Sequence, residues 1–177
     1  MSEIRLAKPT MTYAEQIMAM RREIMDTDSG EDCFAGCSSL EGCETAEAWL
    51  SHLRRFESKE TVPEGYVPST TYLAVRVSDD RLVGIIDLRH HIDHPVLSTW
   101  GGHIGYSVRP SERGHGYAKE MLRLNLENCR AIGINKVLIT CARGNTASEK
   151  TILANGGVFE SEITVDNEVI RRFWITL

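Results

Sequence analysis

A short turn with two glycines constrains this chain more than any other segment, and we call it the glycine elbow (residues 113–118). The alternating apolar residues 102–108 predict a strand before it, and residues 118–132 predict a helix after it. Gly114 and Gly116 allow backbone conformations, and a close approach to a ligand, that a Cβ atom would forbid. A helix that begins here presents unpaired N–H groups and a partial positive charge to anionic oxygens. The pattern therefore predicts a binding site for a diphosphate.

Three kinds of phosphate-binding turn share glycines and a following helix, and the residues after Gly116 separate them. A P-loop requires a hydroxyl side chain for magnesium directly after its lysine, whereas Glu120 follows Lys119 in this chain. A Rossmann turn requires a small residue where this chain has Lys119, and an acid near the end of the next strand, where it has Arg143. The third kind, Arg/Gln-x-x-Gly-x-Gly/Ala, is present as Arg113-Gly114-His115-Gly116-Tyr117-Ala118.

With Val108 and Pro110 ahead of it, this motif resembles the acyl-CoA-binding motif of the GNAT superfamily of N-acyltransferases. A second segment, Asn145-Thr146-Ala147-Ser148, lies where the GNAT pattern has Asn-x-x-Ser, with side chains that face the pantetheine arm and the pyrophosphate. The resemblance covers about residues 72–159 and implies acetyl-CoA as the co-substrate. The residues that it implies for contacts with the cofactor are Val108, Arg113, Gly114, His115, Gly116, Tyr117, Ala118, Asn145 and Ser148.

The second segment also predicts where its own helix begins and ends. Thr146 and Glu149 have the spacing of a capping box, which places the start of the helix at this point. The helix is expected to run to about Asn155, after which Gly156 and Gly157 end it in the left-handed conformation common at helix C-termini.

The rest of the chain predicts one α/β domain over residues 1–177. Further strands are expected at residues 4–8, 71–77, 82–88, 137–142, 160–165 and 169–176, and further helices at residues 13–26 and 46–56, with a polar loop at residues 27–44. The path from the strand before the elbow through its helix to the strand at 137–142 is a crossover, which predicts a parallel strand pair. The GNAT resemblance implies a mixed, mostly antiparallel sheet with helices on both faces, in which that pair splays apart around the cofactor.

Charge and hydropathy exclude several classes of partner. The formal net charge of -5 is modest and mixed in sign, which indicates neither a nucleic acid nor an anionic membrane surface. No apolar run approaches the ~20 residues of a membrane span. Residues 1–5 contain no apolar signal core, so we expect a cytoplasmic protein.

The five cysteines predict core packing and reduced thiols rather than a metal site. Cys129 and Cys141 fall on apolar faces of a predicted helix and a predicted strand. Cys33, Cys37 and Cys43 cluster in the polar loop, but they form no Cys-x-x-Cys pair and no histidine lies among them. We therefore expect no metal.

The chemistry that the resemblance implies is transfer of an acetyl group from acetyl-CoA to a primary amine. A backbone N–H near Val108 would polarise the thioester carbonyl, as in the family. Many GNAT enzymes place a tyrosine seven residues after the Asn, as the acid for the departing thiolate, and here that position holds Ile152. Ser148 and Tyr106 are the candidates to replace it, although a half-buried tyrosine on a strand more often packs with a bonded hydroxyl.

Histidines are the natural candidates for deprotonating the amine, because their pKa lies near neutral pH. His103 begins the strand before the elbow, and His90 opens a histidine-rich segment at residues 90–94. We hypothesise that His103 or His90 deprotonates or positions the acceptor, and the alternative is a solvated loop without a chemical role. His115 is expected to offer its backbone N–H rather than its ring.

Two classes of function stay open. One is an N-acyltransferase with a small-molecule or peptide amine as acceptor, and the other is a non-catalytic acyl-CoA-binding sensor or regulatory module, which the missing tyrosine favours. A nicotinamide- or nucleotide-binding protein is a weaker third class. The acceptor is expected to be selected by residues 27–44, 90–100 and 166–173, while Trp100 and Trp174 are expected to pack in the core. An edge strand near the C-terminus offers a route to a homodimer.

Overall fold

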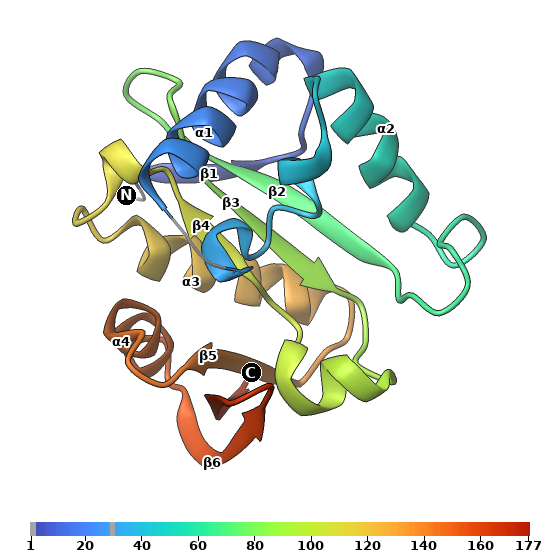
Figure 1. Ribbon diagram of the computed structural model, residues 1–177, viewed down its shortest axis with the longest axis vertical. Helices are drawn as coiled ribbons and strands as arrows, with labels where there is room; N and C mark the ends of the chain where they lie inside the picture. The colour runs from blue at the N-terminus through green and yellow to red at the C-terminus, as the bar shows by residue number, and fades with distance from the viewer. Residues whose placement is uncertain (1–2, 29–30) are drawn as a thin grey trace.

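Two antiparallel sheets form the framework of the computed structural model, which describes residues 3–28 and 31–177 (Figure 1). The first sheet has four strands in the order β1-β2-β3-β4, and the second has three strands in the order β5-β7-β6. The strands are β1 (Ile4–Ala7), β2 (Ser69–Arg76), β3 (Leu82–Arg89), β4 (Tyr106–Val108), β5 (Lys136–Ala142), β6 (Val158–Val165) and β7 (Glu168–Thr176).

Helices cover both faces of the first sheet, which confirms the predicted layers (Figure 1). Helices α1 (Ala14–Thr27) and α2 (Ala46–Phe56) share one hydrophobic core with this sheet, and α3 (Tyr117–Ala131) shares the other. Helix α4 (Thr146–Ala154) packs beside α3. Within the described residues, no helix has the length and apolar character needed to cross a membrane.

The alternation of side chains along β2 explains these layers. Leu73 and Val75 belong to the core with α1 and α2, whereas Ala74 between them belongs to the core with α3. Strand β3 is buried from Leu82 to Leu88, because it lies inside the sheet and is covered on both faces. That burial accounts for its nearly continuous apolar sequence.

The segment predicted as a polar loop, residues 27–44, is in part a packed element. It contains the short 3₁₀ helices η2 (Glu31–Phe34) and η3 (Leu40–Gly42). Cys37 and Leu40 are fully buried against α2, and the indole Nε1 of Trp49 donates a 2.9 Å hydrogen bond to the carbonyl of Cys37. Further short helices are η1 (Met11–Tyr13), η4 (Leu97–Gly101), which is a π-helix, and η5 (Pro110–Glu112).

The predicted capping box at the start of α4 is wrong. The N-cap residue is Asn145, whose Oδ1 accepts the N–H of Ser148 at 3.1 Å, so Thr146 is already inside the helix. Glu149 is taken by another partner, because its carboxylate accepts from the guanidinium of Arg171 on β7. The predicted end is confirmed, since Gly156 has a φ of 83° and its N–H donates to the carbonyl of Leu153.

The strand predicted at residues 102–108 is shorter than expected, and β4 contains only its last three residues. The carboxylate of Asp87 accepts the N–H of Gly105 at 2.7 Å, so this N–H is not available to the ladder with β3. Gly105 also lies directly against the backbone of Gly36, where an added Cβ would come within 2.1 Å of the Gly105 carbonyl oxygen. A side-chain contact and a close backbone approach therefore end the strand.

His103 joins the two sheets. Its N–H donates to the carbonyl of Leu138 on β5 at 2.8 Å, and the N–H of Leu138 donates to its Nδ1 at 2.9 Å. No ladder between β4 and β5 is recorded among the described residues, where every strand pair is antiparallel. The splayed parallel pair thus stays a prediction, and its two strands are connected here through one histidine.

The two hydrogen bonds between His103 and Leu138 predict that stability depends on pH. The side chain is 5% exposed, and burial lowers its pKa to about 4 from an ordinary value of 6.5. Because only the unfolded chain gains this proton between those values, the contribution of His103 is complete above pH 6.5. It is lost as the pH falls to about 4, by about 2 to 3 kcal/mol. Urea unfolding across this range measures it.

His103→Asn is the matched variant, since its side-chain oxygen can accept the Leu138 N–H but does not titrate. We expect the free energy of unfolding of this variant to fall less steeply than that of the wild type between pH 6.5 and pH 4. Parallel curves for the two proteins would contradict the assignment.

Candidate active site

A cavity of about 1050 Å³ opens between β4, β5, the glycine elbow and α4. Every residue that the motifs imply for cofactor contacts lines it except His115, whose Nδ1 lies 3.2 Å from the carbonyl oxygen of Glu112 and whose ring stacks on Tyr117. The lining residues from the two motifs are Val108, Arg113, Gly114, Gly116, Tyr117, Ala118, Asn145 and Ser148. The fold has therefore brought together two segments that are about 30 residues apart in the chain.

The glycine elbow presents free main-chain donors. Gly114 and Gly116 have φ values of 83° and 80°, which favour glycine, and a Cβ added at either would meet nothing within 4 Å. In the described part of the chain, no acceptor is recorded for the main-chain N–H groups of residues 114–118. Helix α3 begins at Tyr117, so its first N–H groups add to this set. The elbow is open to an anion.

Arg113, which the resemblance implies as a cofactor contact, is paired with a carboxylate of the same chain. Its Nη1 and Nη2 lie 2.8 and 2.5 Å from the two carboxylate oxygens of Asp28, at the end of α1. Its Nε donates to the carbonyl of Val108 at 3.2 Å. The guanidinium still lines the cavity, but its charge is already paired.

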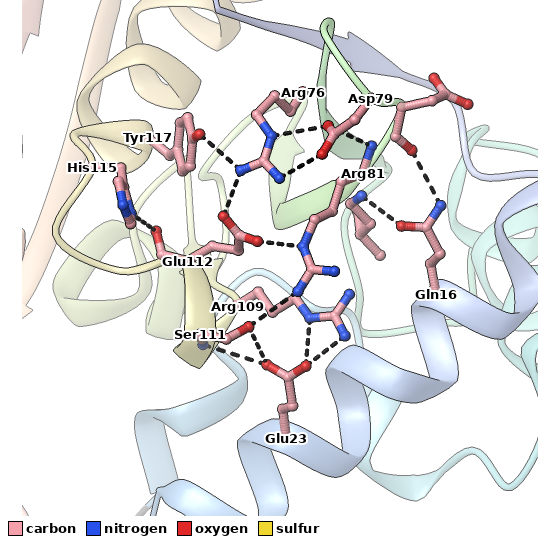
Figure 2. A network of polar contacts seen from close by, with 12 residues as sticks. Gln16, Glu23, Arg76, Asp79, Arg81, Arg109, Ser111, Glu112, His115 and Tyr117 are labelled. Atoms are coloured by element: carbon pink, nitrogen blue, oxygen red, sulfur yellow. Dashed lines mark hydrogen bonds and ion pairs between the residues drawn. The ribbon is translucent and has the colours of Figure 1, made fainter.

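The buried carboxylate of Glu112, directly before the elbow, anchors the elbow through two arginines, as Figure 2 shows. Glu112 is 7% exposed and accepts hydrogen bonds from Arg76 Nη1, at 2.7 Å, and from Arg81 Nε. Arg76 Nη1 also donates to the hydroxyl of Tyr117, the first residue of α3, at 3.2 Å. Asp79 binds the same guanidinium through both carboxylate oxygens. The elbow is thereby fixed to the hairpin of β2 and β3.

A second ion pair fixes the residues just before the elbow to α1 (Figure 2). Glu23 accepts from Arg109 Nε at 2.7 Å and lies 2.5 Å from Arg109 Nη2, and it also accepts from the hydroxyl of Ser111 at 2.8 Å. The Arg109 guanidinium holds the pKa of Glu23 at about 2, so the pair is fully ionised at neutral pH. Neither network could be predicted from the sequence, because the partners lie 36 and 86 residues apart.

Two candidate acids meet in the cavity. The hydroxyl oxygen of Tyr106 lies 2.8 Å from the Oγ of Ser148, and both residues line the cavity wall. Burial raises the pKa of Tyr106 to about 12, so its hydroxyl keeps its proton at neutral pH. Ile152, at the position of the usual tyrosine, is fully buried against Gly157 and has no hydroxyl to offer.

The register of β4 directs main-chain donors into the same space. Arg109 forms a ladder bond to Val83 at 2.9 Å, and Gly84 and Ile86 stand opposite Val108 and Tyr106. Because hydrogen-bonded pairs alternate along an antiparallel ladder, the N–H groups of Val108 and Tyr106 point away from β3. They point toward the side on which the cavity lies.

The candidate histidines do not lie in the cavity. His103 belongs to the joint between the sheets, with its Nδ1 bound by the Leu138 N–H. His90 has its Nε2 2.9 Å from the Thr70 hydroxyl, and burial lowers its pKa. Neither is among the residues that line the cavity, so the geometry does not support the hypothesis that one of them deprotonates the acceptor.

The three segments expected to select the acceptor all contribute to the wall of the cavity. They contribute Cys33, Ala35, Gly36, Trp100, Asp166, Glu168 and Ile170. The expectation that Trp100 packs in the core is wrong, because it is 41% exposed at this wall. Trp174 is partly buried and donates through Nε1 to Glu160 at 2.8 Å. No group of three or more histidine, cysteine or acidic side chains suited to a metal occurs among the described residues.

Comparison with known proteins identifies the family. A family model described as the acetyltransferase (GNAT) domain matches residues 10–158. This match spans well over half of the chain, and the chain belongs to the GNAT acetyltransferase family. A search of curated proteins finds no match.

Several solved structures are similar in fold. MccE, a microcin self-immunity acetyltransferase in complex with acetyl-CoA and AMP, is 14% identical with a TM-score of 0.69, over 100% of this chain and 94% of that one. RimL, a ribosomal alpha-N-protein acetyltransferase in complex with coenzyme A, is 14% identical with a TM-score of 0.68, over 100% and 96%. A chimera of the spermidine N-acetyltransferase SpeG from Vibrio cholerae with hSSAT is 13% identical with a TM-score of 0.65, over 99% and 96%. At these identities the likeness shows the fold alone.

Gly116→Glu tests the elbow as an anion site. A carboxylate here would repel a diphosphate, and we expect coenzyme A to bind about tenfold or more weakly, measured by calorimetry. Gly133→Glu is the matched control, because Gly133 also has a positive φ of 83° and open space around it but does not line the cavity. Both variants carry a backbone cost of about 1 kcal/mol. Equal affinities in the two variants would contradict the site.

Proposed function

We propose that this protein is an N-acetyltransferase that moves the acetyl group of acetyl-CoA to a primary amine, within one acyltransferase domain. The observation that carries the proposal is a single cavity with unbonded N–H groups at one end and the Tyr106–Ser148 hydroxyl pair between its walls. Membership in the GNAT acetyltransferase family supports it. Two of the structural neighbours are named for acetylation of a protein N-terminus and of spermidine, which favours an amine acceptor.

The cavity offers separate groups for the parts of the cofactor. The N–H groups of residues 114–118 would bind the diphosphate, because several donors converge there at the positive end of α3. Asn145 and Ser148 would border the pantetheine arm between β4 and α4. The acetyl group would then lie near Tyr106 and Val108, where the two strands of different sheets face each other.

The reaction needs stabilisation of two developing negative charges. Attack of the amine nitrogen on the thioester carbonyl puts charge on the carbonyl oxygen, and the outward N–H of Val108 can donate to it. Breaking the carbon–sulfur bond then leaves the coenzyme A thiolate. The Tyr106 hydroxyl, hydrogen-bonded with Ser148, is protonated at neutral pH and can donate to that sulfur.

The pKa of Tyr106 limits what it does to the thiolate. A hydroxyl with a pKa of about 12 is a weaker acid than an ordinary thiol, whose pKa is ~8.5. Full proton transfer to the sulfur is therefore unfavourable, and Tyr106 would act chiefly as a hydrogen-bond donor while the proton comes from solvent. With His90 and His103 outside the cavity, Asp166 and Glu168 are the carboxylates that the segments expected to select the acceptor offer for the amine proton.

The activity itself is the first test. We expect acetyl-CoA to lose its acetyl group and release a free thiol only when an amine is present, with saturation in both substrates, across a panel of polyamines, amino acids and peptides. Thermal shifts with coenzyme A, NAD and ATP are the control for cofactor class, and only coenzyme A should raise the melting temperature markedly. Binding of coenzyme A without amine-dependent thiol release would favour a sensor or regulatory module instead.

Tyr106→Phe tests the proposed donor. Removing the hydroxyl should lower kcat about tenfold to 100-fold, with a smaller change in the KM for acetyl-CoA, because the interaction forms as the thiolate leaves. Tyr66→Phe is the control, since Tyr66 is exposed and contacts Phe56 rather than the cavity. Ser148→Ala should lower kcat less in the Tyr106→Phe background than alone. An unchanged kcat for Tyr106→Phe would rule out this role.

A further inference from the structure

Two ion pairs join α1 to the elbow and to the residues just before it, and their arginines differ in exposure. In the pair of Arg109 and Glu23, the arginine side chain is only 8% exposed and the glutamate 29%, and Ser111 adds two further bonds to the carboxylate. In the pair of Arg113 and Asp28, the arginine side chain is 44% exposed and the aspartate 19%. Exposed pairs of this kind add little to stability, whereas removing one partner of a buried pair is costly. The pair of Arg109 and Glu23 is therefore suited to hold α1 in place. The pair of Arg113 and Asp28 can be broken at little cost, which leaves Arg113 able to bind another anion.

The Asp28 carboxylate occupies the position that a phosphate would take on Arg113. Both Nη atoms of the guanidinium face its oxygens, in the forked geometry that arginine also uses for phosphate. Arg113 lies beside Gly114, at the diphosphate end of the cavity. A cofactor that binds the elbow N–H groups would therefore meet this guanidinium while it is paired with a carboxylate of the same protein.

We propose that Asp28 competes with the diphosphate of the cofactor for Arg113 and thereby sets the affinity for coenzyme A. This inference rests on the proposed function, because it requires the diphosphate to bind at the elbow. When the diphosphate binds Arg113, the ion pair between Arg113 and Asp28 is broken. The free energy of that lost pair reduces the free energy of cofactor binding. Asp28 is thus a positioning residue that acts on the cofactor through Arg113.

The rest of the site is built to stay in place during this exchange. Glu23 continues to hold α1 through Arg109. The wall after η2 has its own attachments to the β4 region, since Gly36 packs on Gly105 and the hydroxyl of Ser107 donates to the carbonyl of Ala35 at 2.8 Å. The effect of Asp28 should accordingly fall on cofactor affinity rather than on the fold.

Calorimetry of Asp28→Asn with coenzyme A tests the competition. Freeing Arg113 should tighten binding about twofold to fivefold, which corresponds to the small free energy that an exposed ion pair contributes. Asp26→Asn removes the same charge from an exposed position near the end of α1, and it should leave the affinity at the wild-type value. Asp28→Glu keeps the carboxylate and should stay close to wild type. Weaker or unchanged binding by Asp28→Asn would overturn the proposal.

A double-mutant cycle identifies Arg113 as the group in competition. Arg113→Gln should weaken binding of coenzyme A more in the Asp28→Asn background than in the wild type, and equal losses would overturn the proposal. Dephospho-coenzyme A, which keeps the diphosphate, should show the same gain with Asp28→Asn, and absence of that gain would exclude the diphosphate as the competitor. Failure of the wild type and every variant to bind coenzyme A would instead overturn the proposed function, and this inference with it.

Discussion

Main-chain N–H groups can bind a diphosphate tightly only where the backbone already has the right shape, and here a buried carboxylate imposes that shape. Glu112 lies just before the elbow, with its charge shared between Arg76 and Arg81, and Arg76 also reaches the hydroxyl of Tyr117. Removing either arginine would leave a buried charge without full compensation, which is costly. The elbow is therefore held rigidly by the β2–β3 hairpin, although none of the hairpin residues in this network lines the cavity.

The same sheet provides the opening that the elbow faces. Strand β4 forms a ladder with β3 on one side only, so the outward N–H groups of Tyr106 and Val108 are left for other partners. The Asp87 carboxylate and the close contact of Gly36 with Gly105 end this strand early, and His103 joins the two sheets where the strand has ended. The cavity is thus bounded by a strand that is paired on one side only, so main-chain N–H groups on its other side stay available to a ligand.

Sequence reasoning worked best where the chemistry is carried by backbone and local spacing. The elbow, the strand before it and the helix after it follow from residues within about 30 positions of one another, and the structure places all three as expected apart from the length of β4. Reasoning from location failed for the histidines. His103 precedes the predicted cofactor strand in the chain, yet its ring is turned to Leu138. Adjacent side chains along a strand point to opposite faces, and β4 begins only at Tyr106, so the sequence offers no register that fixes the direction of the His103 ring.

The GNAT resemblance implied the helices on both faces and the motif residues that the structure places in the cavity wall, whereas the amino-acid sequence by itself determined the glycine elbow and most of the helices and strands. These depend on periodicity, on glycine and on short spacing, all of which are local. Only the tertiary structure decided that Arg113 is paired with Asp28, that Glu112 is buried between two arginines, and that Tyr106 meets Ser148. Those contacts join positions 31 to 85 residues apart, and a long charged or hydroxyl side chain has many possible partners until packing brings one of them within hydrogen-bonding distance.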